Sequence, residues 1–208
     1  MFNARPAFQS RVVPVIIIDD VQHAVPMATA LLEGGIDVVE ITLRTEAALG
    51  AIEAVAKALP EMHTGAGTVV RPDQVQSVID AGASFALSPG YTPALIDAVK
   101  AANLPFIPGV MTPGEAMQAQ TMGFSLMKLF PATQAGGIGM LKAMQSPLPD
   151  VRFCPTGGVK PDNLQSFLSQ PNVAMVGGSW LTPAETLAAE DWKQVTALAR
   201  EAVSIANS

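Results

Sequence analysis

The sequence predicts an α/β fold in which eight strand–helix units form a parallel sheet, closed into a (β/α)8 barrel. Eight short apolar runs alternate with eight Ala/Leu-rich amphipathic segments. Parallel neighbours need such crossover helices, so the alternation favours a parallel sheet. No long linker or shift in composition interrupts the 208 residues, so we expect one domain over residues 1–208. An open doubly wound sheet is the alternative, but no Gly-x-Gly-x-x-Gly follows the first run.

The units follow one another in order, and each strand-like run is β-branched or apolar and ends in a polar or glycine-rich turn. We expect strands at residues 12–19, 37–42, 63–68, 85–89, 105–110, 124–130, 152–155 and 173–176. We expect helices at residues 21–32, 46–59, from 72 onward, and at 93–102, 113–122, 137–144, 161–168 and 190–206. Pro72 fits the third helix because proline is tolerated in a first turn. In a barrel of such units, ligands bind at the carboxyl ends of the strands.

Composition excludes several classes of function. Hydrophobic residues make up 49% and charged residues 14%, which is enough apolar material for a large core. The net charge is −6 and no Lys/Arg block occurs, so we expect no nucleic-acid partner. The longest apolar run, 12–18, is far shorter than the roughly 20 residues that span a bilayer, so we expect no membrane partner. No signal-peptide core stands in residues 1–10, and the single cysteine, Cys154, fits a cytoplasmic protein and a buried structural thiol.

Lys128 is the lysine that stands inside an apolar strand, because the other five lie in expected helices or turns. Side chains alternate along a strand, so Lys128 shares a face with Leu126 and Phe130. An unpaired ammonium there costs several kcal/mol, which favours the neutral amine, the form that attacks a carbonyl. The alternatives are a lysine that reaches solvent or one that pairs with an internal carboxylate.

Three companions strengthen the interpretation of Lys128 as a nucleophile. Glu40 is a carboxylate in a buried strand, where it could move protons or form a structural ion pair with Lys128 or Arg44. Arg44 follows at the expected mouth, where its planar guanidinium suits a carboxylate. Thr68, after a Gly-Ala-Gly turn, can add a hydroxyl at the same mouth. We assign Pro89 mainly to the wall of the substrate site.

Two glycine pairs close the seventh and eighth units. Thr156-Gly157-Gly158 and Gly177-Gly178-Ser179 stand where many barrels bind phosphate through backbone N–H groups. His23 and His63 are the only histidines and form no metal-binding motif, so we expect no metal and no cofactor.

Taken together, these motifs resemble the KDPG/KHG aldolase family, the 2-dehydro-3-deoxy-phosphogluconate and 4-hydroxy-2-oxoglutarate aldolases. The resemblance runs almost from end to end. Its motifs are Glu40-Ile-Thr-Leu-Arg44-Thr45, Gly65-Ala-Gly-Thr68, Ser88-Pro-Gly90, Pro108-Gly109, Lys128-Leu-Phe-Pro131, Arg152-Phe-Cys-Pro-Thr-Gly-Gly158 and Gly177-Gly-Ser-Trp180. It implies a class I, metal-independent enzyme on a TIM barrel, usually a homotrimer, that takes a small-molecule 2-keto acid or sugar-acid phosphate.

The resemblance also implies roles for individual residues. Lys128 would form the Schiff base and Glu40 would transfer protons. Arg44, Thr68 and Lys128 would hold the pyruvate moiety. Gly157, Gly158 and Ser179 would hold the phosphate, and we place Pro89, Phe130, Thr156 and Gly178 in the same substrate-binding set. Asp19, Asp20, Thr133 and Gln134 depart from the family pattern near the mouth, which leaves the substrate range open.

The expected reaction is cleavage of KDPG to pyruvate and D-glyceraldehyde 3-phosphate, and possible cleavage of KHG to pyruvate and glyoxylate. Three alternatives remain at this point. They are an aldolase for the galactonate epimer, a phosphate-binding barrel isomerase or synthase with Glu40 as its base, and a non-catalytic protein that binds phosphorylated ligands.

Overall fold

The computed structural model describes residues 8–208, and the expectations that involve residues 1–7 lie outside this part. Strands and helices alternate along the described chain. The strands are β1 (Val12–Ile16), β2 (Val38–Thr42), β3 (His63–Gly67), β4 (Phe85–Leu87), β5 (Phe106–Ile107), β6 (Gly109–Val110), β7 (Leu126–Leu129), β8 (Arg152–Pro155) and β9 (Val176–Gly178). The helices are η1 (Val21–His23), α1 (Ala24–Glu33), α2 (Ala48–Ala58), α3 (Asp73–Asp80), α4 (Pro93–Ala101), α5 (Pro113–Thr121), α6 (Gly137–Gln145), α7 (Pro161–Leu168), α8 (Ala184–Ala188) and α9 (Trp192–Ala206).

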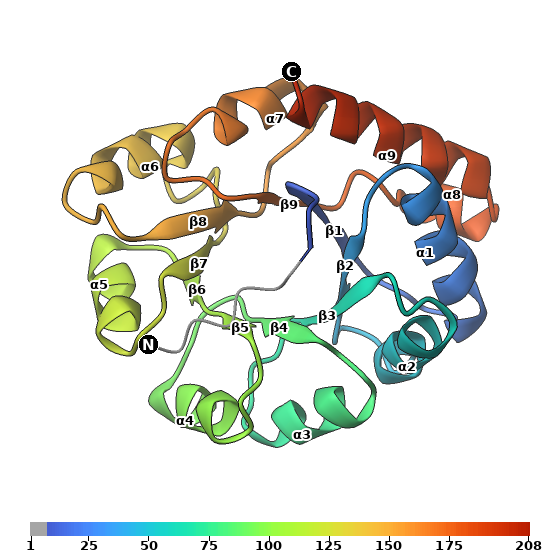
Figure 1. Cartoon of the computed structure of the whole chain (residues 1–208), viewed down its shortest axis with the longest axis horizontal. Coiled ribbons are helices and arrows are strands. Elements are labelled where there is room, and N and C mark those ends of the chain that lie inside the picture. Colours follow the sequence, from blue (N-terminus) through green and yellow to red (C-terminus); the bar gives the residue numbers. More distant parts are fainter. Residues whose placement is uncertain (1–7) are drawn as a thin grey trace.

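Every pair of neighbouring strands is parallel, as the alternation of strands and helices predicts. Six strands form a sheet in the order β5-β4-β3-β2-β1-β9, and three form a second sheet in the order β6-β7-β8. An isolated parallel bridge between Thr156 and Gly177 joins the segment after β8 to β9. Figure 1 shows the strands curled around a common centre with the helices outside them. The protein is therefore an α/β fold with a curled parallel sheet.

Several boundaries differ from those expected. The run at 105–110 is divided into β5 and β6 by Pro108, which has no N–H to donate to a strand ladder. The first strand ends at Ile16 instead of residue 19, and the last lies at Val176–Gly178 instead of 173–176. The final helical segment is preceded by α8, which the sequence did not predict.

The core fills the space between the sheets and the helix layer. All five residues of β1 and all five of β2 are buried, so both faces of these strands are covered. Phe85 and Phe153 are among the largest fully buried side chains. Burying a side chain of this size contributes about 1.5–3 kcal/mol. The strands are therefore rigid supports for side chains at their carboxyl ends.

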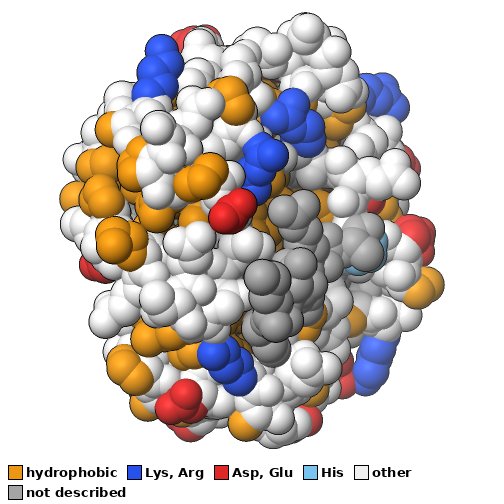
Figure 2. All heavy atoms as spheres, turned by 60° about the vertical axis from the view of Figure 1, so that its left-hand side comes forward, with side chains coloured by type: hydrophobic (Ala, Val, Ile, Leu, Met, Phe, Trp, Pro, Cys, Tyr) orange, Lys and Arg blue, Asp and Glu red, His pale blue; other side chains and the backbone are white. Residues whose placement is uncertain are grey.

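The surface is mixed in character. Figure 2 shows one face on which Lys/Arg and Asp/Glu side chains are interspersed among apolar and uncharged ones. Within residues 8–208, no helix combines the length and apolar character that a membrane span requires.

Candidate active site

Lys128 and Glu40 form a buried ion pair that joins the two sheets. Lys128 lies on β7 and is 4% exposed, and Glu40 lies on β2 and is 1% exposed. The Lys128 Nζ donates to Glu40 Oε1 at 2.9 Å, although the two residues are 88 positions apart. Of the two partners that the sequence left open for Glu40, the structure therefore selects Lys128.

The room for Glu40 depends on a glycine in the neighbouring strand. Gly67 of β3 lies so close to the Glu40 carboxylate that a Cβ there would stand 2.2 Å from Oε1. The other carboxylate oxygen, Oε2, is buried and has no hydrogen-bond partner among the described residues. A buried unsatisfied oxygen is costly and is uncommon away from functional sites. Oε2 is thus an unpaired acceptor on the carboxylate that contacts the Lys128 amine.

Arg44 reaches the same site from the turn after β2. Its Nε donates to Thr68 Oγ1 at 3.4 Å, and no carboxylate within residues 8–208 forms an ion pair with it. Thr68 has a positive φ of 60°, which is strained for a β-branched residue and costs on the order of 1–3 kcal/mol. That strained turn orients the Thr68 hydroxyl toward Arg44. The remaining guanidinium donors are left for an anion.

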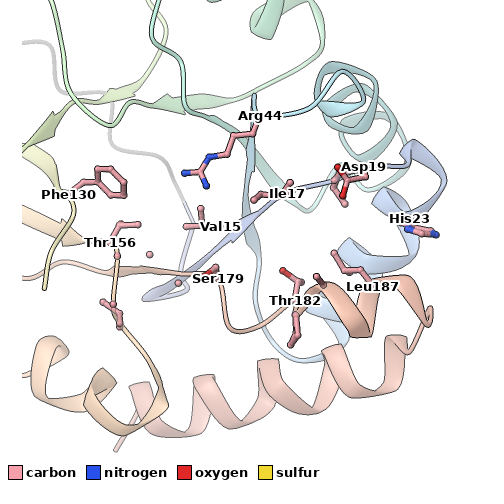
Figure 3. A pocket seen from close by; sticks show the side chains of 18 of the residues that line it. Val15, Ile17, Asp19, His23, Arg44, Phe130, Thr156, Ser179, Thr182 and Leu187 are labelled. Carbon is pink, nitrogen blue, oxygen red and sulfur yellow. The ribbon is translucent and has the colours of Figure 1, made fainter. Parts of the chain in front are cut away.

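A cavity of about 680 Å³ lies beside these residues. Figure 3 shows Arg44, Phe130, Thr156 and Ser179 pointing toward its centre. Eight residues of the expected site line it, namely Arg44, Lys128, Phe130, Thr156, Gly157, Gly158, Gly178 and Ser179. Glu40, Thr68 and Pro89 do not line it. Glu40 lies behind Lys128, Thr68 behind Arg44, and Pro89 packs its backbone within 2.2 Å of where a Gly109 Cβ would stand.

The two glycine pairs bring backbone to the cavity wall. Gly157 and Gly158 have φ values of 97° and 83°, a region that favours glycine. A Cβ on Gly158 would meet the Thr133 hydroxyl at 2.3 Å, so Thr133 lies directly behind this turn. At the end of β9, a Cβ on Gly178 would meet the Trp180 ring at 1.7 Å. A side chain at Gly158 or Gly178 would therefore require Thr133 or Trp180 to move.

The prediction that Cys154 is a buried thiol is confirmed. The pKa of this thiol is raised to about 12, and burial is the largest cause. The nearby Lys128 charge lowers the pKa and the Glu40 charge raises it, both by less than burial does. The thiol is therefore protonated and unsuited to act as a nucleophile at neutral pH.

Sequence reasoning missed part of the cavity wall. The cavity is also lined by His23, Thr182, Pro183, Ala184, Leu187 and Ala188. Asp19 and Asp20, which the sequence analysis placed near the mouth, line it as well. The sequence analysis considered His23 only for metal binding and argued against that role. In the structure its Nε2 lies 3.5 Å from a Glu190 carboxylate oxygen. Among residues 8–208 no group of three His, Cys, Asp or Glu side chains is placed to hold a metal ion.

The fold and the cavity define an α/β enzyme whose ligand site lies at the carboxyl ends of parallel strands. Residues 7–198 match the family model "KDPG and KHG aldolase". The KHG/KDPG aldolase of Escherichia coli (strain K12) is 50% identical over 192 residues, which are 92% of this chain and 90% of that protein. This chain therefore belongs to the KDPG and KHG aldolase family, whose members are aldehyde-lyases.

Two solved structures are also similar to it. The KDPG aldolase of Legionella pneumophila, with pyruvate captured as a covalent carbinolamine, superposes with a TM-score of 0.91 at 45% identity, over 93% of this chain and 94% of that one. The 2-keto-3-deoxy-6-phosphogluconate aldolase of Zymomonas mobilis ZM4 with 3-phosphoglycerate superposes with a TM-score of 0.89 at 40% identity, over 94% and 92%.

Proposed function

We propose that this enzyme is a class I aldolase that cleaves KDPG to pyruvate and D-glyceraldehyde 3-phosphate through a Schiff base on Lys128. KHG, cleaved to pyruvate and glyoxylate, is a second substrate. The observation that carries the proposal is the buried amine of Lys128, 2.9 Å from a carboxylate and open to a 680 Å³ cavity. A structural ion pair alone would need no such cavity beside it.

The first half of the reaction forms the imine. Glu40 takes a proton from Lys128, and the neutral amine adds to the C2 carbonyl of the substrate. A proton moves from the added nitrogen to the former carbonyl oxygen and gives the neutral carbinolamine. Its hydroxyl then leaves as water after Glu40 returns a proton, and the product is the iminium. Glu40 can serve each of these transfers because its oxygen already lies within hydrogen-bond distance of Nζ.

The second half breaks the carbon–carbon bond. A water molecule relays the proton of the C4 hydroxyl to Glu40, which does not line the cavity itself and whose Oε2 has no partner among the described residues. The electrons of the C3–C4 bond move into the iminium, the aldehyde leaves and an enamine of pyruvate remains. Glu40 gives up the proton it gained, which adds at C3, and water hydrolyses the iminium to release pyruvate and the free amine. The protonated imine is the electron sink, so the chemistry needs no Lewis acid.

The remaining site residues position the substrate. Arg44, with Thr68 behind it, holds the carboxylate and so presents C2 to the amine. Phe130 forms the cavity wall beside the reacting amine, because its ring centroid is 5.4 Å from the Lys128 Nζ. Pro89 shapes the wall behind Gly109.

Phosphate binding is assigned to Thr156, Gly157, Gly158, Gly178 and Ser179. All five line the cavity, and the glycine turns bring their backbone to its surface. Binding this remote group positions the reacting end.

The same proposal includes four features of the whole molecule. Residues 1–208 form one domain, and the two sheets together form a closed (β/α)8 barrel. The Thr156–Gly177 bridge supports closure on one side. On the other, Gly109 of β6 packs against the backbone of Pro89 after β4. The family resemblance supports a cytoplasmic location and a homotrimer. Sedimentation equilibrium tests the homotrimer.

The decisive experiment is reduction with borohydride in the presence of pyruvate, followed by peptide mass analysis. We expect a reduced pyruvate adduct on the Lys128 peptide. Lys128→Ala should abolish it, and Lys142→Ala, at an exposed position of α6, should leave it unchanged. An isomerase or synthase that uses Lys128 only as a charge would give no adduct, and this result would refute the proposal.

A substrate panel tests the reaction itself. Pyruvate release from KDPG, KHG and the galactonate epimer of KDPG is measured with lactate dehydrogenase, with and without EDTA. We expect KDPG to be cleaved with the highest kcat/KM and EDTA to have no effect. Faster cleavage of the galactonate epimer would replace the proposed substrate, and binding without pyruvate release would identify a non-catalytic protein.

A further inference from the structure

The cavity carries opposite charges at its two ends. Its described lining contains two cationic side chains, Arg44 and Lys128. Lys128 is buried against Glu40, and Figure 3 shows Arg44 extending toward Phe130 and Thr156, at what we call the inner end. At the outer end, Figure 3 shows Asp19 and His23 on one wall, with Thr182 and Leu187 facing them on the other. No Lys or Arg stands among the described residues that line this outer end.

Thr182 is the clearest unexplained polar group in the outer end. Its side chain lines the cavity while the residue is 8% exposed. Its hydroxyl forms no hydrogen bond with any other residue in the part of the chain that the structure describes. The hydroxyl oxygen is not among the enclosed atoms without a partner, so it is accessible at the cavity surface. There it can exchange a hydrogen bond with a polar atom of a ligand.

Asp19 and Asp20 differ in how their carboxylates are used. Asp20 accepts a hydrogen bond from the backbone N–H of Gln22 at 2.8 Å, which caps η1 and fixes the Asp20 carboxylate. Asp19 has no ion pair with a described residue, and its exposed carboxylate lines the cavity. His23 is held by Glu190 at 3.5 Å. The charged groups at this end are therefore mostly acidic.

This combination suits one kind of ligand. A phosphate dianion placed beside two carboxylates is repelled, and nothing cationic in the described lining of the outer end offsets the repulsion. An uncharged hydroxyl can instead donate to the Asp19 carboxylate and exchange a hydrogen bond with Thr182. Leu187 and Ala188 add an apolar surface that accommodates the carbon chain between such hydroxyls.

We propose that the outer end of the cavity, formed by Asp19 and Thr182, is a subsite for an uncharged hydroxyl-bearing chain. It makes unphosphorylated 2-keto-3-deoxy sugar acids a further substrate class of this enzyme. The inference rests on the proposed aldolase function, since the 2-keto acid end must react at Lys128. The reaction is the same cleavage, and its products are pyruvate and an unphosphorylated hydroxyaldehyde.

The test uses 2-dehydro-3-deoxygluconate, in which a hydroxyl stands where KDPG has its phosphate. Its kcat/KM is measured beside those of KDPG and KHG for the wild type, Thr182→Val and Asp19→Asn. The valine keeps the shape of Thr182 without its hydroxyl, and the asparagine removes only the charge of Asp19. Asp97→Asn, on the exposed side of α4, is the matched control.

We expect the wild type to release pyruvate from the unphosphorylated substrate. Thr182→Val should lower the ratio of this kcat/KM to that for KHG by about three- to tenfold, the size of one neutral hydrogen bond. Asp19→Asn should lower it by about tenfold and raise kcat/KM for KDPG by about two- to fivefold, because a repulsive charge is removed. Asp97→Asn should change none of these values.

Two results would overturn the subsite. One is cleavage of KDPG but not of the unphosphorylated acid by the wild type. The other is a ratio within twofold of wild type in both Thr182→Val and Asp19→Asn. In either case the pyruvate adduct on Lys128 would still form. Loss of that adduct would instead refute the proposed function, so the two failures are distinguishable.

Discussion

Replacing Gly67 by alanine tests whether an empty position in β3 sets the geometry of the active site. The φ of Gly67 is not positive, so alanine is compatible with its backbone and the added methyl is the only change. That methyl would stand 2.2 Å from Glu40 Oε1 and 2.6 Å from its Cγ. Ordinary contact begins near 3.4 Å, so the carboxylate must retreat by about 1.2 Å, the difference of the two distances.

The expected losses of stability and activity follow from the close packing around Glu40. The residue is 1% exposed, so its displacement disturbs packed neighbours at about 1–3 kcal/mol. The retreat also stretches the 2.9 Å bond to Lys128, a charge-assisted bond worth about 1.5–3 kcal/mol. We expect the free energy of unfolding to fall by about 2–5 kcal/mol and Tm by roughly 5–15 °C. A proton-transfer group displaced by about 1 Å should lower kcat about 100-fold.

The assay combines thermal unfolding with pyruvate release from KDPG. Gly114→Ala is the control, since nothing lies within 4 Å of its added methyl and alanine suits a helix better than glycine. Gly67→Ala combined with Glu40→Asp should recover stability but not activity, because the shorter acid leaves space for the methyl. A Gly67→Ala enzyme with wild-type Tm and kcat would refute the reasoning.

Three further predictions follow from other buried or partnered groups. Lys128→Met leaves the Glu40 carboxylate buried without a cation and should lower the free energy of unfolding, measured with denaturant, by about 3–5 kcal/mol. Lys128→Met combined with Glu40→Gln should lower it by less, because no buried charge remains. Equal losses in the two variants would contradict this reasoning. Cys154, whose pKa burial raises from 9.0 to about 12, should resist thiol reagents in the native state at pH 8. Because the unfolded chain loses this proton at a lower pH than the folded one, the free energy of unfolding should fall as the pH rises from 9 to 12. Cys154→Ala should flatten this decline in unfolding experiments at a series of pH values. The backbone N–H of Met111 donates to Glu115 Oε2 at 2.7 Å, and this bond holds the pKa of the Glu115 carboxyl below its usual range. Stability from this carboxylate is therefore present above pH 4.5 and lost as the pH falls, and Glu115→Gln should weaken that acid dependence; an unchanged acid-unfolding curve would contradict the assignment.

The alternation of apolar runs and helical segments predicted the order of the elements, because hydrophobic periodicity is a local property. The exceptions have local causes that a periodicity does not register. Pro108 interrupts a run that is apolar on both sides and so divides it into two short strands. The five residues of α8 are too few to show an amphipathic period. Strand ends also depend on pairing across the sheet, which no single run contains.

The chemistry of the site was easier to predict than its shape. Lys128 and Glu40 stood out because a charge inside an apolar strand conflicts with its surroundings. Their contact could not be derived, since it joins residues 88 positions apart on different sheets. Thr182 gave no signal at all. A threonine in a loop is ordinary, and only the folded chain shows that this side chain lines a cavity.

The structure separates the residues proposed for the chemistry from those proposed for substrate selection. All five positions of β2 and all four of β7 are buried, so a change beside Glu40 or Lys128 alters packing in every direction. Asp19 and Asp20 are exposed in the loop after β1, and Thr182 lies in the loop before α8. Loops tolerate substitution better than buried strands because fewer packed neighbours must adjust. Substitutions in these two loops can therefore alter which aldehyde half is accepted while the buried pair that forms and breaks the imine stays in place.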